Sequence, residues 1–216
     1  MNYKIAIDGT AGSGKSTICK LIAKDFDFIF VSTGGFYRAF AYILNKAKKI
    51  DVSEEEIINE LDKYNVEVKG DIFYIDNNDV TSLLKTEDIS LIASTIASRA
   101  YIRNYVNKRL VELIKTYPKV LMDGRGIVEE IMPDADLKLF FYSSLFIRTK
   151  RRVKELKQLN KKGNFISVYF DLMKRDWKDK HRELAPSKLS SGTIKINTSK
   201  KSIDEVYLEV KKYIKV

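Results

Sequence analysis

The sequence predicts an α/β fold in which a five-stranded parallel sheet is flanked by helices. Short apolar segments alternate with segments whose apolar residues recur at helical spacing, which is typical of a doubly wound sheet. A Gly-rich turn at residues 9–14 separates the first apolar segment from the first helical one. The alternation stops between residues 51 and 100, where we expect a small inserted α+β subdomain. A chain of 216 residues suits a single domain, 1–216, with such an insertion.

The first elements follow one another closely at the N-terminus. Residues 3–8 are apolar and end at Asp8-Gly9, as a short buried strand does. A helix is predicted from Lys15 to about Asp25, and a second apolar strand at residues 28–31. Gly34-Gly35 then opens a second amphipathic helix. The order strand, turn, helix, strand is the start of a doubly wound fold.

The insertion has a different pattern. Residues 54–64 are expected to be helical, and residues 66–68 and 72–75 are expected to be two strands joined by a hairpin turn. Asn77-Asn78-Asp79 predicts a further turn, after which Val80 begins a third short strand.

The α/β alternation resumes after the insertion. The predicted helices are residues 99–116, 144–160, 164–182 and 203–214. The predicted strands are residues 119–123, 137–141 and 194–196, which bring the core sheet to five strands.

Composition narrows the class of protein. The chain is 44% hydrophobic and 31% charged, as soluble globular proteins are. It has one cysteine, no apolar signal core and no apolar stretch of about 20 residues that would span a bilayer. These features favour a cytoplasmic location and predict no membrane partner.

The formal charge of +10 comes mostly from scattered lysines, and no nucleic-acid-binding motif accompanies it. We therefore expect no nucleic-acid partner. A nucleotide-gated nucleic-acid-binding protein remains as a less favoured alternative.

The Gly-rich turn carries the strongest chemical signal. Residues 9–16 fit the pattern G-x-x-x-x-G-K-[ST] and stand between a predicted strand and a predicted helix, the context of a P-loop. Backbone N–H groups of such a loop face phosphate, while Lys15 adds a charge near the β- and γ-phosphates and Ser16 is placed to ligate Mg²⁺. The predicted phosphate-binding residues are Gly9, Thr10, Ala11, Gly12, Ser13, Gly14, Lys15 and Ser16. The fold is therefore predicted to be that of a P-loop NTPase that binds a nucleoside triphosphate with Mg²⁺, a description that switch GTPases, motor ATPases and small-molecule kinases share.

Two further strand ends carry candidate ligands. Tyr37 and Arg38 follow the second strand, where ligands sit in open α/β sheets, and Arg38 can bind a second phosphate. Asp123 ends the third strand and can hold a Mg²⁺-bound water, while Arg125 follows it and can face the phosphates.

A charged helix completes the candidate site. Arg175, Lys178, Asp179 and Arg182 are spaced by three, four and seven residues, which places them on one helix face. Cations with a carboxylate on one face suit a phosphoryl transition state and a ribose hydroxyl.

Together these segments resemble bacterial cytidylate kinases, in order and over nearly the whole chain. The resemblance rests on five segments: Ile7–Thr17, Thr33–Arg38, Asp123–Arg125, Pro133–Lys138, and Arg175-Asp176 with Asp179, Arg182, Ala185 and Pro186. It implies a nucleoside monophosphate kinase that phosphorylates CMP and dCMP with MgATP, and a monomer. It also implies that residues 51–100 bind the monophosphate and that residues 158–185 form a helical lid.

The resemblance assigns roles to individual positions. It adds Thr17 to the ATP-binding loop, and it makes Lys15, Arg125, Arg175, Lys178 and Arg182 the catalytic cations. The implied acceptor-binding residues are Thr33, Tyr37, Arg38, Ser94, Arg103, Arg125, Arg175, Asp179 and Arg182. Arg148, Arg151 and Arg152 approach the lid, and which of them contacts ATP is left open.

Three positions depart from the family pattern. Gly126 stands where an Asp usually accepts a hydrogen bond from the base, Ser32 where an Asp is frequent, and Lys178 where an Arg is usual. Loss of a hydrogen-bond acceptor weakens discrimination between bases. A P-loop kinase for UMP or for another small molecule therefore stays open as an alternative.

Overall fold

A computed structural model of the chain describes residues 2–69, 72–158, 160–161, 163–181 and 189–215. The chain divides into two compact units. The first contains Met1–Phe28 and Leu121–Val216, and the second contains Ile29–Val120.

The predicted five-stranded parallel sheet is confirmed, with the order β2-β6-β1-β7-β8. Its strands are β1 (Tyr3–Gly9), β2 (Ile29–Ser32), β6 (Lys119–Asp123), β7 (Leu137–Tyr142) and β8 (Ile194–Asn197). In the first unit β1 pairs parallel with β7, Ile7 opposite Leu139, and β7 pairs parallel with β8, Phe141 opposite Ile196. Ile5, Ala6 and Ile7 are all fully buried, as expected for a parallel strand covered on both faces.

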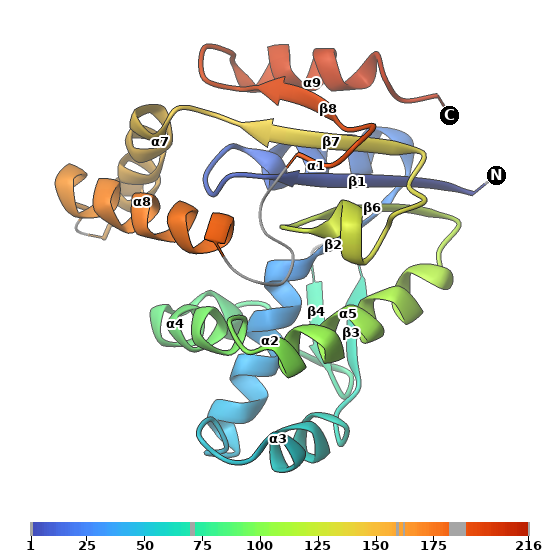
Figure 1. Ribbon diagram of the computed structural model, residues 1–216, viewed down its shortest axis with the longest axis vertical. Coiled ribbons are helices and arrows are strands. Elements are labelled where there is room, and N and C mark those ends of the chain that lie inside the picture. The colour runs from blue at the N-terminus through green and yellow to red at the C-terminus, as the bar shows by residue number, and fades with distance from the viewer. Residues whose placement is uncertain (1, 70–71, 159, 162, 182–188, 216) are drawn as a thin grey trace. The chain divides into compact units, whose positions relative to one another are not determined.

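The helices of the first unit are α1 (Lys15–Phe26), α6 (Ile127–Glu130), α7 (Leu145–Gln158), α8 (Phe165–His181) and α9 (Ile203–Lys211) (Figure 1). Helix α1 packs against α9, and α7 packs against α8. Helix α6 was not predicted from the sequence, because four residues are too few to show helical periodicity. The predicted last helix ends earlier than expected, at Lys211.

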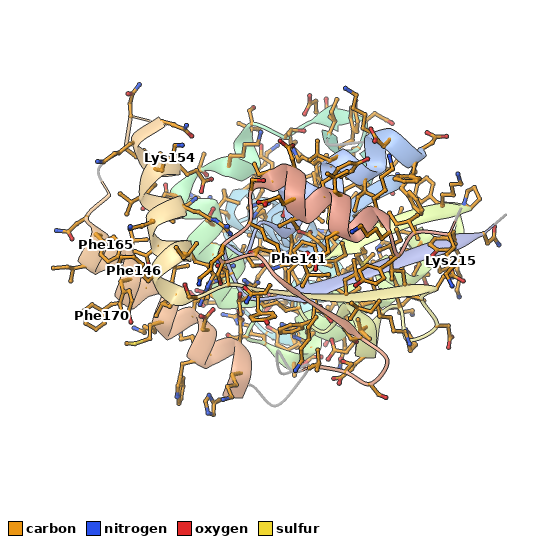
Figure 2. The ribbon with its side chains drawn as sticks, turned by 90° about the horizontal axis from the view of Figure 1, so that it is seen from above. Phe141, Phe146, Lys154, Phe165, Phe170 and Lys215 are labelled. Carbon is orange, nitrogen blue, oxygen red and sulfur yellow. The ribbon has the colours of Figure 1, made fainter. Side chains whose placement is uncertain are left out.

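Helices α7 and α8 form a hairpin with a small apolar core. Val168 and Leu172 of α8 are buried against the P-loop residue Ala11, with Leu145, Val153 and Leu156 of α7 packed around them. Aromatic rings continue this contact, since the Phe146 and Phe165 ring centroids are 5.5 Å apart (Figure 2). The hairpin is therefore joined to the P-loop by packing. The predicted lid, residues 158–185, includes α8 and also residues outside the described ones, and its role as a lid stays a prediction.

The second unit contains α2 (Thr33–Lys46), α3 (Glu54–Leu61), β3 (Val66–Lys69), β4 (Ile72–Ile75), β5 (Asn78–Asp79), α4 (Glu87–Ile96) and α5 (Ala100–Lys115). Its three strands form an antiparallel sheet in chain order. The turn expected at residues 77–79 comes one residue earlier, because Asp76 and Asn77 take left-handed φ angles of 49° and 65°. Helix α4 was not predicted, since its Ile, Ser and Thr residues have modest helix propensity.

The N-terminus of α2 lies against the small sheet. A Cβ on Gly35 would come within 2.1 Å of Phe73 Cζ, so only glycine allows this approach. The Phe36 and Phe73 rings meet edge to face, with centroids 5.5 Å apart. Residues 51–100 lie within this unit, and their role as a separate monophosphate-binding subdomain stays a prediction.

Among the residues that the structure describes, no helix has the length and apolar character that crossing a membrane requires.

Candidate functional site

The P-loop joins the end of β1 to the start of α1. Gly9, Gly12 and Gly14 have φ angles of 145°, 71° and 89°, which residues with side chains rarely adopt. The Thr10 N–H donates to the Phe141 carbonyl over 3.0 Å and fixes the start of the loop to β7. Because α1 begins at Lys15, its first N–H groups have no carbonyl partners within the helix and can bind phosphate.

Lys15 is buried within this loop. Its Nζ donates to the Gly9 carbonyl over 2.9 Å and to the Thr10 carbonyl over 2.8 Å. Burial, together with the nearby Arg125 charge, lowers the pKa of Lys15 to about 8. The ammonium is therefore held beside the backbone that would receive phosphate, with a pKa close to neutral pH.

We expect ATP binding to weaken as pH rises through about 8, the pKa of Lys15. Only the protonated amine attracts phosphate, so above that pKa ATP binding must take up a proton. By linkage, the Kd for ATP then rises by up to about tenfold per pH unit. Titration calorimetry between pH 7 and 9.5 measures this, and the Lys15→Ala variant serves as the control because it should lack the rise. A Kd for ATP that is flat over this range in the unmodified protein would contradict the prediction.

Ser16 and Asp123 form a pair of oxygen ligands. The Ser16 hydroxyl donates to Asp123 Oδ2 over 2.5 Å, and the Asp123 carboxylate is buried at the end of β6. Hydroxyl and carboxylate oxygens are the ligands that Mg²⁺ prefers. These two oxygen ligands therefore fit the predicted magnesium site.

Asp8 fixes the turn that carries Arg125 through hydrogen bonds. The Asp8 carboxylate accepts hydrogen bonds from the N–H groups of Ile127 and Val128, at 3.0 and 3.1 Å, and so satisfies the start of α6. Burial raises the pKa of Asp8, although these hydrogen bonds oppose the rise. Arg125 itself forms an ion pair with Asp179 of α8. Two residues that the family resemblance assigns to the acceptor nucleotide are therefore brought together in the first unit.

Sequence reasoning missed the contact between the P-loop and Thr198. The Thr198 hydroxyl, at the end of β8, donates to the Ser13 carbonyl over 2.9 Å, and Arg151 of α7 donates to Thr198. The available signal was topological, because the carboxyl ends of parallel strands meet at the phosphate-binding edge.

The three arginines of α7 differ in their surroundings. Arg148 is buried and donates hydrogen bonds to Ala11 and Asp176. Arg151 donates to Thr198, whereas Arg152 is exposed and forms an ion pair with Glu155 one turn away.

A cleft lies in the first unit, beside the phosphate-binding edge of the sheet. It has a volume of about 680 Å³ and borders the residues that flank Thr198. Its lining consists of Ser144, Phe146, Ile147, Asn197, Ser199, Lys200 and Lys201. The Phe146 ring and the charge of Lys200 suit a flat, anionic ligand, whereas Lys201 forms an ion pair with Glu209 over 2.6 Å.

The remaining catalytic candidates lie on or beyond α8. Arg175 and Lys178 are exposed on this helix. Arg182, with Ala185 and Pro186 of the family pattern, lies outside the described residues.

The second unit holds the other acceptor candidates. Arg103 of α5 is buried, and its guanidinium carbon lies 5.8 Å from the centre of the Tyr37 ring. Arg38 turns back toward the start of α2, where its Nη1 is 3.6 Å from the place a Gly34 Cβ would occupy. Thr33 begins α2 and is buried, and Ser94 is exposed on α4. Tyr37 and Arg103 are thus adjacent, as a phosphate-binding pair within one unit would be.

Comparison with known proteins places this geometry in a family. The sequence model of the family described as cytidylate kinase matches residues 5–216. A cytidylate kinase of Rickettsia rickettsii (strain Sheila Smith) is 39% identical over 214 residues, 99% of this chain and 92% of that protein. One from Ureaplasma urealyticum serovar 10 is 36% identical over 202 residues, 93% of this chain and 90% of that protein.

Among solved structures, a shikimate kinase from Bacteroides thetaiotaomicron has a TM-score of 0.51 and 16% identity. The match covers 97% of this chain and 96% of that one and supports the fold alone. The P-loop at the end of β1 and sequence identity along almost the full length lead to one conclusion: the chain belongs to the cytidylate kinase family.

Proposed function

We propose that the protein transfers the γ-phosphoryl group of MgATP to CMP and dCMP, forming CDP and dCDP. The observation that carries the proposal is the P-loop with its buried Lys15, beside the hydrogen-bonded Ser16 and Asp123, in a chain of this family. A monomeric state and a cytoplasmic location remain predictions from the family resemblance and from the single cysteine.

The first unit supplies the donor-binding residues of the proposal. The N–H groups of residues 9–17 bind the ATP phosphates, and the cleft beside Thr198 takes the nucleoside. Ser16 would hold Mg²⁺ directly and Asp123 would hold it through water. The metal would neutralise negative charge on the ATP phosphates.

The family resemblance assigns acceptor-binding residues in both units. In the second unit Thr33, Tyr37, Arg38 and Arg103 bind the acceptor phosphate or its surroundings, and Ser94 lies near the cytosine. In the first unit Arg125 binds phosphate, and Arg175 and Asp179 bind the sugar. Arg125 and Asp179, which are assigned to the phosphate and the sugar, form an ion pair with each other.

The transfer needs positioning and charge rather than a catalytic base. An oxygen of the acceptor phosphate attacks the γ-phosphorus in line, a new P–O bond forms, and the bond to the β-phosphate oxygen breaks to release ADP. Lys15, Arg125, Arg175 and Lys178 stabilise the charge on the transferring group, and Arg182, outside the described residues, is assigned the same role.

An acceptor panel tests the proposal. ATP-dependent ADP release is measured with Mg²⁺ and each of CMP, dCMP, UMP, AMP, GMP and dTMP. We expect CMP and dCMP to stand far above the rest. If UMP rivals CMP, the alternative of a P-loop kinase with another acceptor gains support, and Gly126 is the feature that favours it. If none of the six stimulates release, the acceptor assignment is wrong.

Replacing Gly126 by Asp should raise selectivity for CMP over UMP. Gly126 has φ 81° and ψ 18°, a left-handed conformation that costs Asp about 1–2 kcal/mol. A restored carboxylate can accept from the cytosine amino group, and a hydrogen bond to a charged group contributes about 1.5–3 kcal/mol. The ratio of kcat/KM for CMP and UMP should rise by about tenfold to a hundredfold.

The Gly126→Asn variant is the matched control for this prediction. It bears a similar backbone cost and lacks the negative charge. Equal ratios in folded Gly126→Asp and in the unmodified protein would show that this position does not read the base.

A further inference from the structure

Arg148 is a buried arginine whose donors are directed at protein groups. It is 4% exposed, and its Nε donates to the Ser143 carbonyl over 3.0 Å. Its Nη1 donates to the Ala11 carbonyl of the P-loop, also over 3.0 Å. A Cβ on Gly12 would lie 3.6 Å from Arg148 Cβ, so the side chain also runs close beneath the loop.

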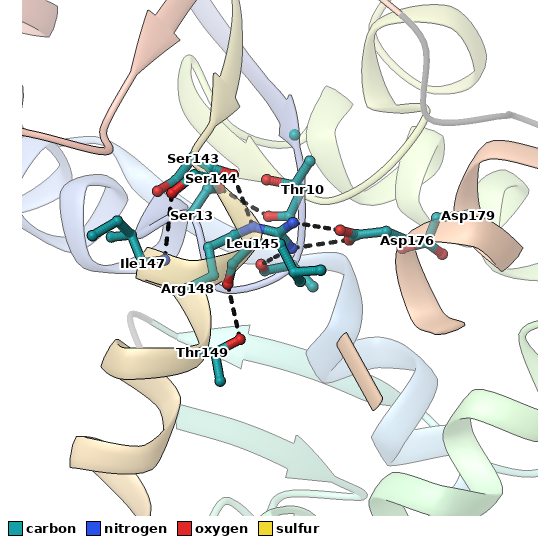
Figure 3. Close-up of polar contacts among 12 residues, drawn as sticks. Thr10, Ser13, Ser143, Ser144, Leu145, Ile147, Arg148, Thr149, Asp176 and Asp179 are labelled. Carbon is teal, nitrogen blue, oxygen red and sulfur yellow. Dashed lines mark hydrogen bonds and ion pairs between the residues drawn. The ribbon is translucent and has the colours of Figure 1, made fainter. Parts of the chain in front are cut away.

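The remaining contacts of Arg148 lead to α8. Nη1 and Nη2 donate to the two carboxylate oxygens of Asp176, at 3.0 and 2.5 Å, in a bidentate ion pair (Figure 3). One planar guanidinium therefore links the residue that follows β7, the P-loop and α8. A lysine could not make these contacts, because its single ammonium lacks the rigid fork.

Asp176 lies among the residues of α8 to which the proposed mechanism assigns substrate contacts. Arg175 precedes it, and Lys178 and Asp179 follow within one turn. Asp179 forms the ion pair with Arg125. The Arg148–Asp176 pair uses neither of these groups, so it can persist whether or not the Arg125–Asp179 pair changes when nucleotide binds.

We propose that Arg148 and Asp176 are positioning residues that hold α8 in register with the P-loop, so that the cations of α8 are kept at the place where the P-loop binds the transferring phosphoryl group. The proposal deepens the proposed function and rests on it. The pair itself does not bind nucleotide, since four of the five N–H groups of Arg148 donate to protein.

The test variant is Asp176→Asn, which keeps the shape and removes the charge. Asp171→Asn is the matched control, because Asp171 is exposed on the same helix. The Arg148→Lys variant and the double variant with both Arg148→Lys and Asp176→Asn complete a double-mutant cycle. Steady-state kcat and KM are measured with the best acceptor of the panel, the Kd for a fluorescent ATP analogue by titration, and the folded fraction by circular dichroism.

We expect Asp176→Asn to lower kcat by about tenfold to a hundredfold, because small displacements of transition-state groups have effects of this size. Both KM values and the Kd for the ATP analogue should stay within about threefold of the unmodified protein. The double variant should lose no more kcat than the worse single variant, as residues acting as one unit do.

Two results would overturn the inference. One is an Asp176→Asn protein with the kcat of Asp171→Asn. The other is a loss of activity that matches the loss of folded protein or of analogue binding, since that assigns the pair to stability alone. Arg148→Lys is judged by the same two criteria if Asp176→Asn does not fold. A wrong proposed function would be detected separately, because the unmodified protein would then not favour CMP and dCMP in the acceptor panel.

Discussion

A Lys15→Ala protein is expected to fold and to lose turnover by about 10²–10³-fold, the effect of removing one preorganised donor to the transition state. Lys15 Nζ already lies beside the carbonyls of Gly9 and Thr10, so its charge needs little movement to reach the phosphates. Folding should be maintained, because burial disfavours the charged ammonium and lowers its pKa.

The measurement is kcat with saturating MgATP and CMP. Lys24→Ala is the control, since Lys24 is exposed in the last turn of the same helix. Near-normal turnover in folded Lys15→Ala protein would remove Lys15 from the proposed mechanism.

The second large effect is expected from Gly9→Ala, which should lower the free energy of unfolding by about 2–6 kcal/mol. An added Cβ would come within 2.0 Å of the Phe141 carbonyl oxygen, a backbone atom of the paired strand β7. Overpacking costs about 1–3 kcal/mol, and a strained φ angle about the same again. Since domains are stable by only about 5–15 kcal/mol, a large share of the stability is lost.

Urea unfolding followed by circular dichroism measures this change. Gly192→Ala is the control, because Gly192 also has a positive φ, of 73°, but no atom lies within 4 Å of its added Cβ. It should cost only about 1–2 kcal/mol. Equal losses in the two variants would show that the contact with β7 is not the cause.

The sequence by itself predicted the features that depend on neighbouring residues. The P-loop was predicted from the spacing of Gly9, Gly14 and Lys15, because the binding backbone and the charge come from one continuous segment. The five core strands were predicted from short apolar segments, since strand and helix periodicities are local properties of the chain. Family membership followed from motifs in a fixed order and was confirmed by the comparisons.

Only the tertiary structure decided the contacts between distant segments. Asp8 accepts a hydrogen bond from the N–H group at the start of α6, which lies 119 residues further along the chain. Arg148 pairs with Asp176, and the Thr198 hydroxyl donates to the Ser13 carbonyl across 185 residues of sequence. Each of these side chains also has an ordinary local interpretation, as a surface or turn residue, and none belongs to a periodic pattern. Their partners are determined by which strands lie side by side and where their carboxyl ends meet, and that depends on packing of the whole sheet rather than on any one segment.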